Sequence, residues 1–134
     1  MFFAFFYFVF VNPFNTLERN DIFTLVTENR VYLEAYIEHG DFLELLEIDE
    51  IQSVRSFGDT IEFACGGSGL GSATFYCGFY YSENDDLYGI WCAPTEGSSL
   101  TPVDGGFLYE EAKGDNRYYT EHICGHFYYY EAAF

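Results

Sequence analysis

The sequence predicts a single α+β domain, in which a helical part comes first and packs on an antiparallel sheet. Between residues 16 and 39, apolar residues recur about every 3.6 positions, the period of one buried helix face. From Ile51 onward, apolar and polar residues alternate between turn-forming Gly, Asn and Asp, which is typical of strands. A chain of 134 residues has room for one core. We therefore expect one helical layer on one antiparallel meander over about 51–132.

The helical part is expected to contain a long helix and a short one. The long helix begins at about Thr16 or Asp21 and ends at His39. Its apolar face is formed by Ile22, Leu25, Val26, Leu33, Tyr36 and Ile37. Gly40 suits the position after the helix, because glycine readily takes the positive φ found there. The short helix follows Asp41, and its apolar edge is formed by Phe42, Leu45 and Leu46.

The strands are expected between clear turn signals. Gly58 and Asp59 predict a two-residue hairpin turn. The predicted strands are 60–65, 73–81, 88–92, 107–112, 117–124 and 127–132, and the stretch Ala93–Gly106 is interpreted as a long loop. Two aromatic segments, 75–83 and 123–131, resemble each other and predict two neighbouring strands in one sheet. Their tyrosines predict one sheet face whose hydroxyl groups reach water.

Residues 1–14 form a segment distinct from the acidic domain, residues 15–134. The segment carries no charge, and seven of its residues are Phe. As a helix, the part before Asn12 would rise about 16 Å, against about 30 Å of bilayer hydrocarbon. Three interpretations stay open: part of a longer membrane anchor, a segment on the membrane surface, or an aromatic element buried in the domain or a dimer. The first predicts a membrane-anchored or extracytoplasmic domain, with a cytosolic location as the alternative.

The charge of the chain excludes one class of partner and indicates another. Acidic residues number 22 and basic residues 5, a formal net charge of −17. Direct binding to nucleic acid requires Lys and Arg at the phosphates, so we do not expect it. A compact acidic domain could instead imitate nucleic acid and capture a basic protein, as inhibitors and immunity proteins do. The acidic turns would contact that partner through Glu83, Asp85, Asp86, Glu110 and Glu111.

Two groups of residues are candidates for metal binding. His122, Cys124 and His126 alternate, so on one strand they would share a face and offer zinc ligands. The carboxylates around Asp85 and Glu110 are candidates for calcium, although neither group has the spacing of an EF-hand loop. The expected cofactor is none, with zinc or calcium as the alternatives.

The cysteine count bears on the compartment. Cys65, Cys77, Cys92 and Cys124 form an even set, which fits two disulfides in an oxidising compartment or four thiols in a reducing one. Three disulfide connectivities are open.

Some blocks of the sequence resemble a known type of bacterial protein. The segments 77–82, 114–123 and 127–131 are similar to uncharacterised small proteins of Gram-positive bacteria, in which a hydrophobic N-terminal anchor precedes one acidic extracytoplasmic domain. The resemblance covers roughly residues 15–134 and implies no activity and no catalytic residue. It implies a membrane-anchored location. The segment 1–14 departs from the pattern because it is short and has no basic residue to orient an anchor.

These observations predict a non-catalytic binding or structural module of the bacterial cell envelope, with an unknown protein or envelope ligand as its partner. The first alternative is an acidic inhibitor that captures a basic protein. The second is a metal-binding protein that uses His122, Cys124 and His126. An enzyme is not expected, because the serine and histidine residues lie in no nucleophile-elbow pattern.

Overall fold

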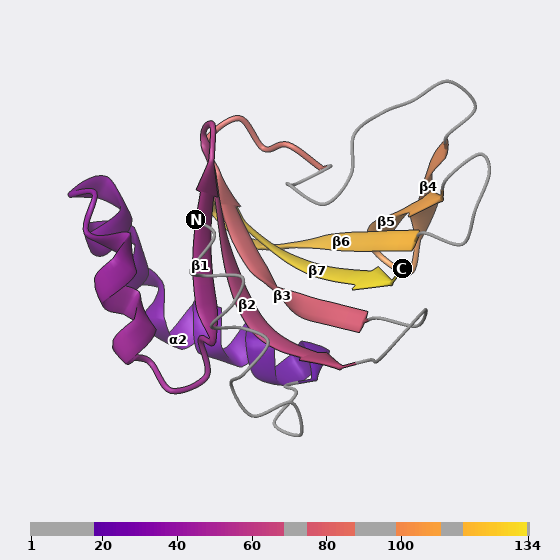
Figure 1. Ribbon diagram of the computed structural model, residues 1–134. Helices are drawn as coiled ribbons and strands as arrows, with labels where there is room; N and C mark the ends of the chain where they lie inside the picture. The colour runs from indigo at the N-terminus through magenta and orange to yellow at the C-terminus, as the bar shows by residue number, and fades with distance from the viewer. Residues whose placement is uncertain (1–17, 69–74, 88–98, 111–116, 134) are drawn as a thin grey trace.

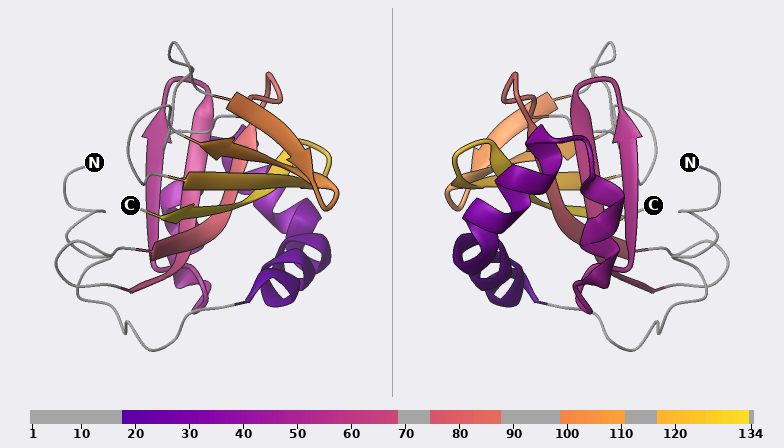
Figure 2. Two further views of the ribbon diagram at one scale, coloured as in Figure 1. Left: turned by 90° about the vertical axis from the view of Figure 1, so that its right-hand side faces the viewer. Right: turned by 90° about the vertical axis from the view of Figure 1, so that its left-hand side faces the viewer.

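The chain folds into a helical layer on one side of a seven-stranded antiparallel sheet, which confirms the predicted α+β class. The computed structural model describes residues 18–68, 75–87, 99–110 and 117–133. Helix α2 spans Arg19–Glu38, and the short 3-10 helix η1 spans Phe42–Glu47. The strands are β1 (Ser53–Phe57), β2 (Thr60–Ser68), β3 (Phe75–Ser82), β4 (Ser99–Val103), β5 (Gly106–Glu110), β6 (Arg117–Cys124) and β7 (Phe127–Ala133). Both helices cover the same face of the sheet (Figure 2).

The strand order shows that the sheet consists of two meanders joined side by side. The order is β1-β2-β3-β7-β6-β5-β4, so β4 lies at the edge opposite β1. The join is the antiparallel pairing of β3 with β7, in which Phe79 lies opposite Tyr129 and Tyr80 opposite Tyr128. These are the two similar aromatic segments, and the prediction that they are neighbours is confirmed. We expected a single meander in chain order. The observed strands follow that order only from β1 to β3, and β7 then takes the next position in the sheet.

Both ends of α2 have local stabilisation. The backbone N–H of Glu18 donates to the Asp21 carboxylate, and Asp21 donates its own N–H to the Glu18 side chain. Gly40 has a φ of +78°, as predicted for the residue after a helix. In η1 side chains repeat every three residues, so Leu45 is buried while Leu46 points outward and is 37% exposed. The prediction that Leu46 faces the core is therefore wrong.

The two faces of the sheet bury different side chains. Toward the helices, Phe63 stacks on Phe79 with ring centroids 4.7 Å apart, and Ile22 and Leu33 of α2 pack on the same cluster. The opposite face gathers tyrosines that are at most 6% exposed, namely Tyr80, Tyr109, Tyr118, Tyr128 and Tyr130. The prediction that these hydroxyl groups reach water is wrong. Burial of both faces explains how a chain of this size encloses so many rings.

One predicted loop contains a strand and a tight turn. Residues 99–103 form β4, and Asp104 and Gly105 connect it to β5 with φ values of +49° and +86°. Two consecutive positive φ angles define the type I′ hairpin turn. Asp-Gly is a preferred pair for that turn, so the sequence contained a signal that the loop interpretation missed. The two-residue turn at Gly58 and Asp59 is confirmed, because β1 ends at Phe57 and β2 begins at Thr60.

Several predictions lie outside the described residues. These are the segment 1–14, the helix start at Thr16 and the strand at 88–92. In the parts of the chain that are described, no helix is long and apolar enough to span a bilayer.

Two phenylalanines provide a matched test of the core. Phe79 is fully buried between Phe63 and Phe127, whereas Phe57 at the β1–β2 turn is 75% exposed. Replacing Phe79 by Ala should lower the free energy of unfolding by about 3–5 kcal/mol, because it removes ring contacts and leaves a cavity. The control Phe57→Ala should change it by about 0.5 kcal/mol or less. Urea denaturation measures both, and equal effects would contradict the described packing.

Candidate binding pocket

A pocket of about 470 Å³ lies where the beginning of α2, the β4–β5 turn and the strands β6 and β7 meet. Part of its wall is apolar, formed by Phe75, Val103, Leu108 and two alanines at the end of β7. The rest is polar and is formed by Arg19, Asp104, Arg117, Tyr119, Glu121 and Glu131. Residues from five separate segments of the chain thus contribute to one site.

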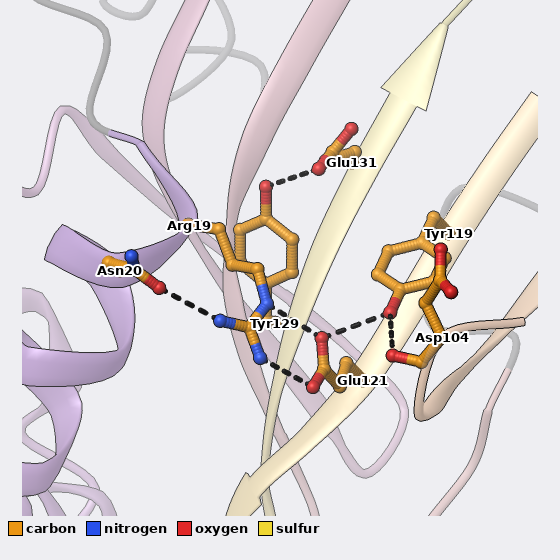
Figure 3. A network of polar contacts seen from close by, with 7 residues as sticks. All are labelled: Arg19, Asn20, Asp104, Tyr119, Glu121, Tyr129 and Glu131. Atoms are coloured by element: carbon orange, nitrogen blue, oxygen red, sulfur yellow. Dashed lines mark hydrogen bonds and ion pairs between the residues drawn. The ribbon is translucent and has the colours of Figure 1, made fainter.

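The first half of the polar wall is a network centred on Glu121 (Figure 3). Arg19 donates two hydrogen bonds to the Glu121 carboxylate, at 2.8 Å from Nε and 2.5 Å from an Nη atom. Tyr119 donates its hydroxyl hydrogen to the same carboxylate at 3.0 Å. The Arg19 guanidinium also lies over the ring of Phe23, with Cζ 4.0 Å from the centroid. The network ties α2 to β6.

The network holds its groups in fixed protonation states near neutral pH. The hydrogen bonds from Arg19 lower the pKa of Glu121, so this carboxylate stays ionised. Desolvation, followed by the hydrogen bond to Glu121, raises the pKa of Tyr119 to about 12, so its hydroxyl stays protonated. Neither group is suited to exchange a proton at pH 7.

The second half of the polar wall is less constrained. Glu131 accepts a hydrogen bond from the Tyr129 hydroxyl at 2.6 Å. Asp104 is exposed at the β4–β5 turn, where its carbonyl oxygen lies 3.5 Å from the Tyr119 hydroxyl. The Arg117 side chain is 60% exposed, and its Nε atom lies 3.7 Å from the carboxylate of Glu110, a residue that does not line the pocket. Neither Asp104 nor Glu131 forms an ion pair with another described residue, so both can receive a cation from outside.

The structure does not bring His122, Cys124 and His126 together. The His122 ring packs against Tyr128 and its Nε2 lies 2.8 Å from the Gly125 carbonyl oxygen, whereas Cys124 packs on the cluster under α2. The strand register shifts between His122 and Cys124, which destroys the alternation on which the zinc prediction depended. Within the described ranges, no three His, Cys, Asp or Glu side chains are placed to hold a metal ion.

His126 and Asp85 instead join two turns. The Asp85 Oδ1 atom accepts a hydrogen bond from the Tyr128 hydroxyl at 2.8 Å and lies 3.0 Å from His126 Nδ1. Contact with His126, and then with Tyr128, lowers the pKa of Asp85. Asp85 is one of the acids predicted to contact a partner, and here it supports the turn that follows β3. Of the others, Glu83 and Glu110 are exposed, Asp86 is half-buried and Glu111 lies outside the described residues.

The cysteines show no pairing among those described. Cys65, Cys77 and Cys124 are not disulfide-bonded, and Cys92 lies outside the described residues. Burial raises the pKa of the Cys65 thiol and raises that of Cys77 to about 12. Both side chains therefore pack as apolar groups in the core under α2.

Comparisons with protein-family models, with curated proteins and with solved structures found no match. The similarity to anchored proteins of Gram-positive bacteria therefore stays a prediction. None of the five charged residues of the pocket was predicted from the sequence as a site residue. These are Arg19, Asp104, Arg117, Glu121 and Glu131. The Asp-Gly turn is the one local signal that would have indicated Asp104.

The link between Arg19 and Glu121 should make stability depend on pH. The pKa of Glu121 is lower in the folded state, so the contribution is present above the unfolded pKa of about 4.3 and is lost as pH falls through the folded pKa. At pH 7, Glu121→Gln should lower the free energy of unfolding by about 1 kcal/mol. The difference should shrink toward pH 3. Denaturation at both pH values measures it, with the exposed Glu47→Gln as control.

Proposed function

We propose that this protein is a non-catalytic binding module whose partner is a basic protein. The observation that supports the proposal is the internal use of its arginines. Each of the four has a glutamate partner in the same chain, in the pairs Arg19–Glu121, Arg30–Glu34, Arg55–Glu62 and Arg117–Glu110. The remaining basic residue, Lys113, lies outside the described residues. Among the residues that the structure describes, the acids therefore far outnumber the arginines that could neutralise them.

The unneutralised charge is concentrated where a partner could approach. From Glu18 to Glu50, the helical part carries ten acidic residues and two arginines, both of which are in the pairs above. Like charges at this density repel one another and destabilise the compact state. Attraction of a basic protein would relieve that repulsion and speed association. Solubility alone is the competing explanation for the charge.

We further propose that the module acts at the bacterial cell envelope and that Met1–Phe14 associates it with the membrane. The support is compositional, because the segment has no charge and would expose seven Phe rings in water. This location and the choice of partner are independent proposals.

A salt series tests the choice of partner. The full chain, immobilised and incubated with extract of its source cells, should retain a protein with a high isoelectric point at low salt. The protein should be released at about 1 M salt, where screening acts within about 3 Å. Retention that persists undiminished at 1 M salt, or an acidic retained protein, would contradict electrostatic capture.

Cell fractionation tests the location. The full chain should sediment with membranes, and a chain beginning at Asn15 should remain in the supernatant, because the deletion removes the Phe-rich segment. Recovery of both chains in the supernatant would count against the envelope proposal and would leave the choice of partner unaffected.

A further inference from the structure

We infer that the pocket beside Arg19 receives a lysine or arginine side chain of the basic partner. The inference rests on the proposed function and adds the point of contact. It follows from three properties of the described residues: an apolar wall, two carboxylates without a cation, and a turn that holds one of these carboxylates in place.

The walls match the two parts of a basic side chain. Lysine and arginine combine an apolar stem with a charged end, and they bind best where the stem meets apolar atoms and the end meets carboxylates. Phe75, Val103 and Leu108 provide the apolar contact, and Asp104 and Glu131 provide the carboxylates. A volume of about 470 Å³ exceeds that of one side chain, so the partner's neighbouring atoms would also enter.

The electrostatic balance of the pocket favours a cation. Glu121 neutralises Arg19 through two short hydrogen bonds. Arg117 is mostly exposed and faces Glu110, which is not part of the wall. Apart from these two pairs, the charged residues of the wall are Asp104 and Glu131. The Tyr129 hydroxyl donates a hydrogen bond to Glu131 but carries no charge, so the negative charge of Glu131 is not neutralised.

The β4–β5 turn holds Asp104 at the pocket before any partner binds. Gly106 follows the turn, and a Cβ atom there would lie 2.4 Å from the Thr120 carbonyl oxygen and 2.5 Å from the Tyr119 hydroxyl. The turn is thus pressed against β6, in contact with the Glu121 network (Figure 3). Such preorganisation lowers the entropy cost of binding.

A pair of small probes tests the inference on the full chain. N-acetyl-L-arginine N-methylamide carries one positive charge and no other, and the corresponding citrulline compound has nearly the same shape without the charge. In a titration followed by amide NMR shifts, the arginine probe should bind with a Kd of about a few mM and shift residues of β6, β7 and the β4–β5 turn. The citrulline probe should bind at least about fivefold more weakly.

Variants that each remove one negative charge distinguish binding by the pocket from attraction by the overall charge of the chain. Asp104→Asn should weaken the arginine probe about fivefold, and Asn tolerates the φ of +49° at this turn. Glu131→Gln should act similarly and keeps an acceptor for Tyr129. The control Glu47→Gln removes the same charge from η1, outside the pocket wall, and should leave the Kd unchanged. Equal weakening by the control, equal binding of the citrulline probe, or shifts located elsewhere would overturn the inference.

The same variants distinguish failure of the inference from failure of the proposed function. If the salt-sensitive basic partner is captured by wild type and equally well by the Asp104→Asn, Glu131→Gln double variant, the pocket is not the point of contact, although the function stands. If the probe binds as described but no basic partner is found, the proposed function fails and the pocket remains a cation site.

Discussion

The pairing of β3 with β7 is the constraint on which the rest of the structure depends. It joins the two meanders into one sheet, and it places the rings of both aromatic segments in register. Tyr80 stacks on Tyr128 on one face, with ring centroids 5.2 Å apart, while Phe79 meets Phe127 on the other at 6.1 Å. α2 covers the second of these faces, and Arg19 at its beginning is thereby brought to Glu121 of β6.

That arrangement also explains the position of the pocket. α2 packs over a cluster to which β2, β3, β6 and β7 contribute, and Arg19 in its first turn bonds to Glu121 of β6. Beyond this contact the face of β6 and β7 carries Tyr119 and Glu131, which border the pocket together with the β4–β5 turn. The position of the pocket therefore follows from where α2 begins, and its carboxylates come from β6, β7 and the β4–β5 turn.

Local patterns predicted the long helix and most of the strands, missed β4, and were insufficient to predict the site. The period of Ile22, Leu25 and Leu33 located α2, and the alternation in β6 and β7 located those strands to within a residue. The adjacency of β3 and β7 could be inferred because the two segments resemble each other. No such signal links Arg19 with Glu121, which lie 102 positions apart in the sequence. The shared face that the zinc prediction assumed for His122, Cys124 and His126 is absent for a related reason, because the register shift before Cys124 depends on strand pairing and not on residue type.

The tyrosine face has a consequence for behaviour in alkaline solution. Desolvation raises the pKa of Tyr80 and Tyr130 far above that of a free phenol and raises that of Tyr128 to about 12. The unfolded chain releases these protons from about pH 10 upward, whereas the folded chain retains them. Each buried phenol therefore shifts the folding equilibrium toward the unfolded chain as the pH rises. The folded chain, in which these rings join the two meanders, is therefore less stable in base than in neutral solution.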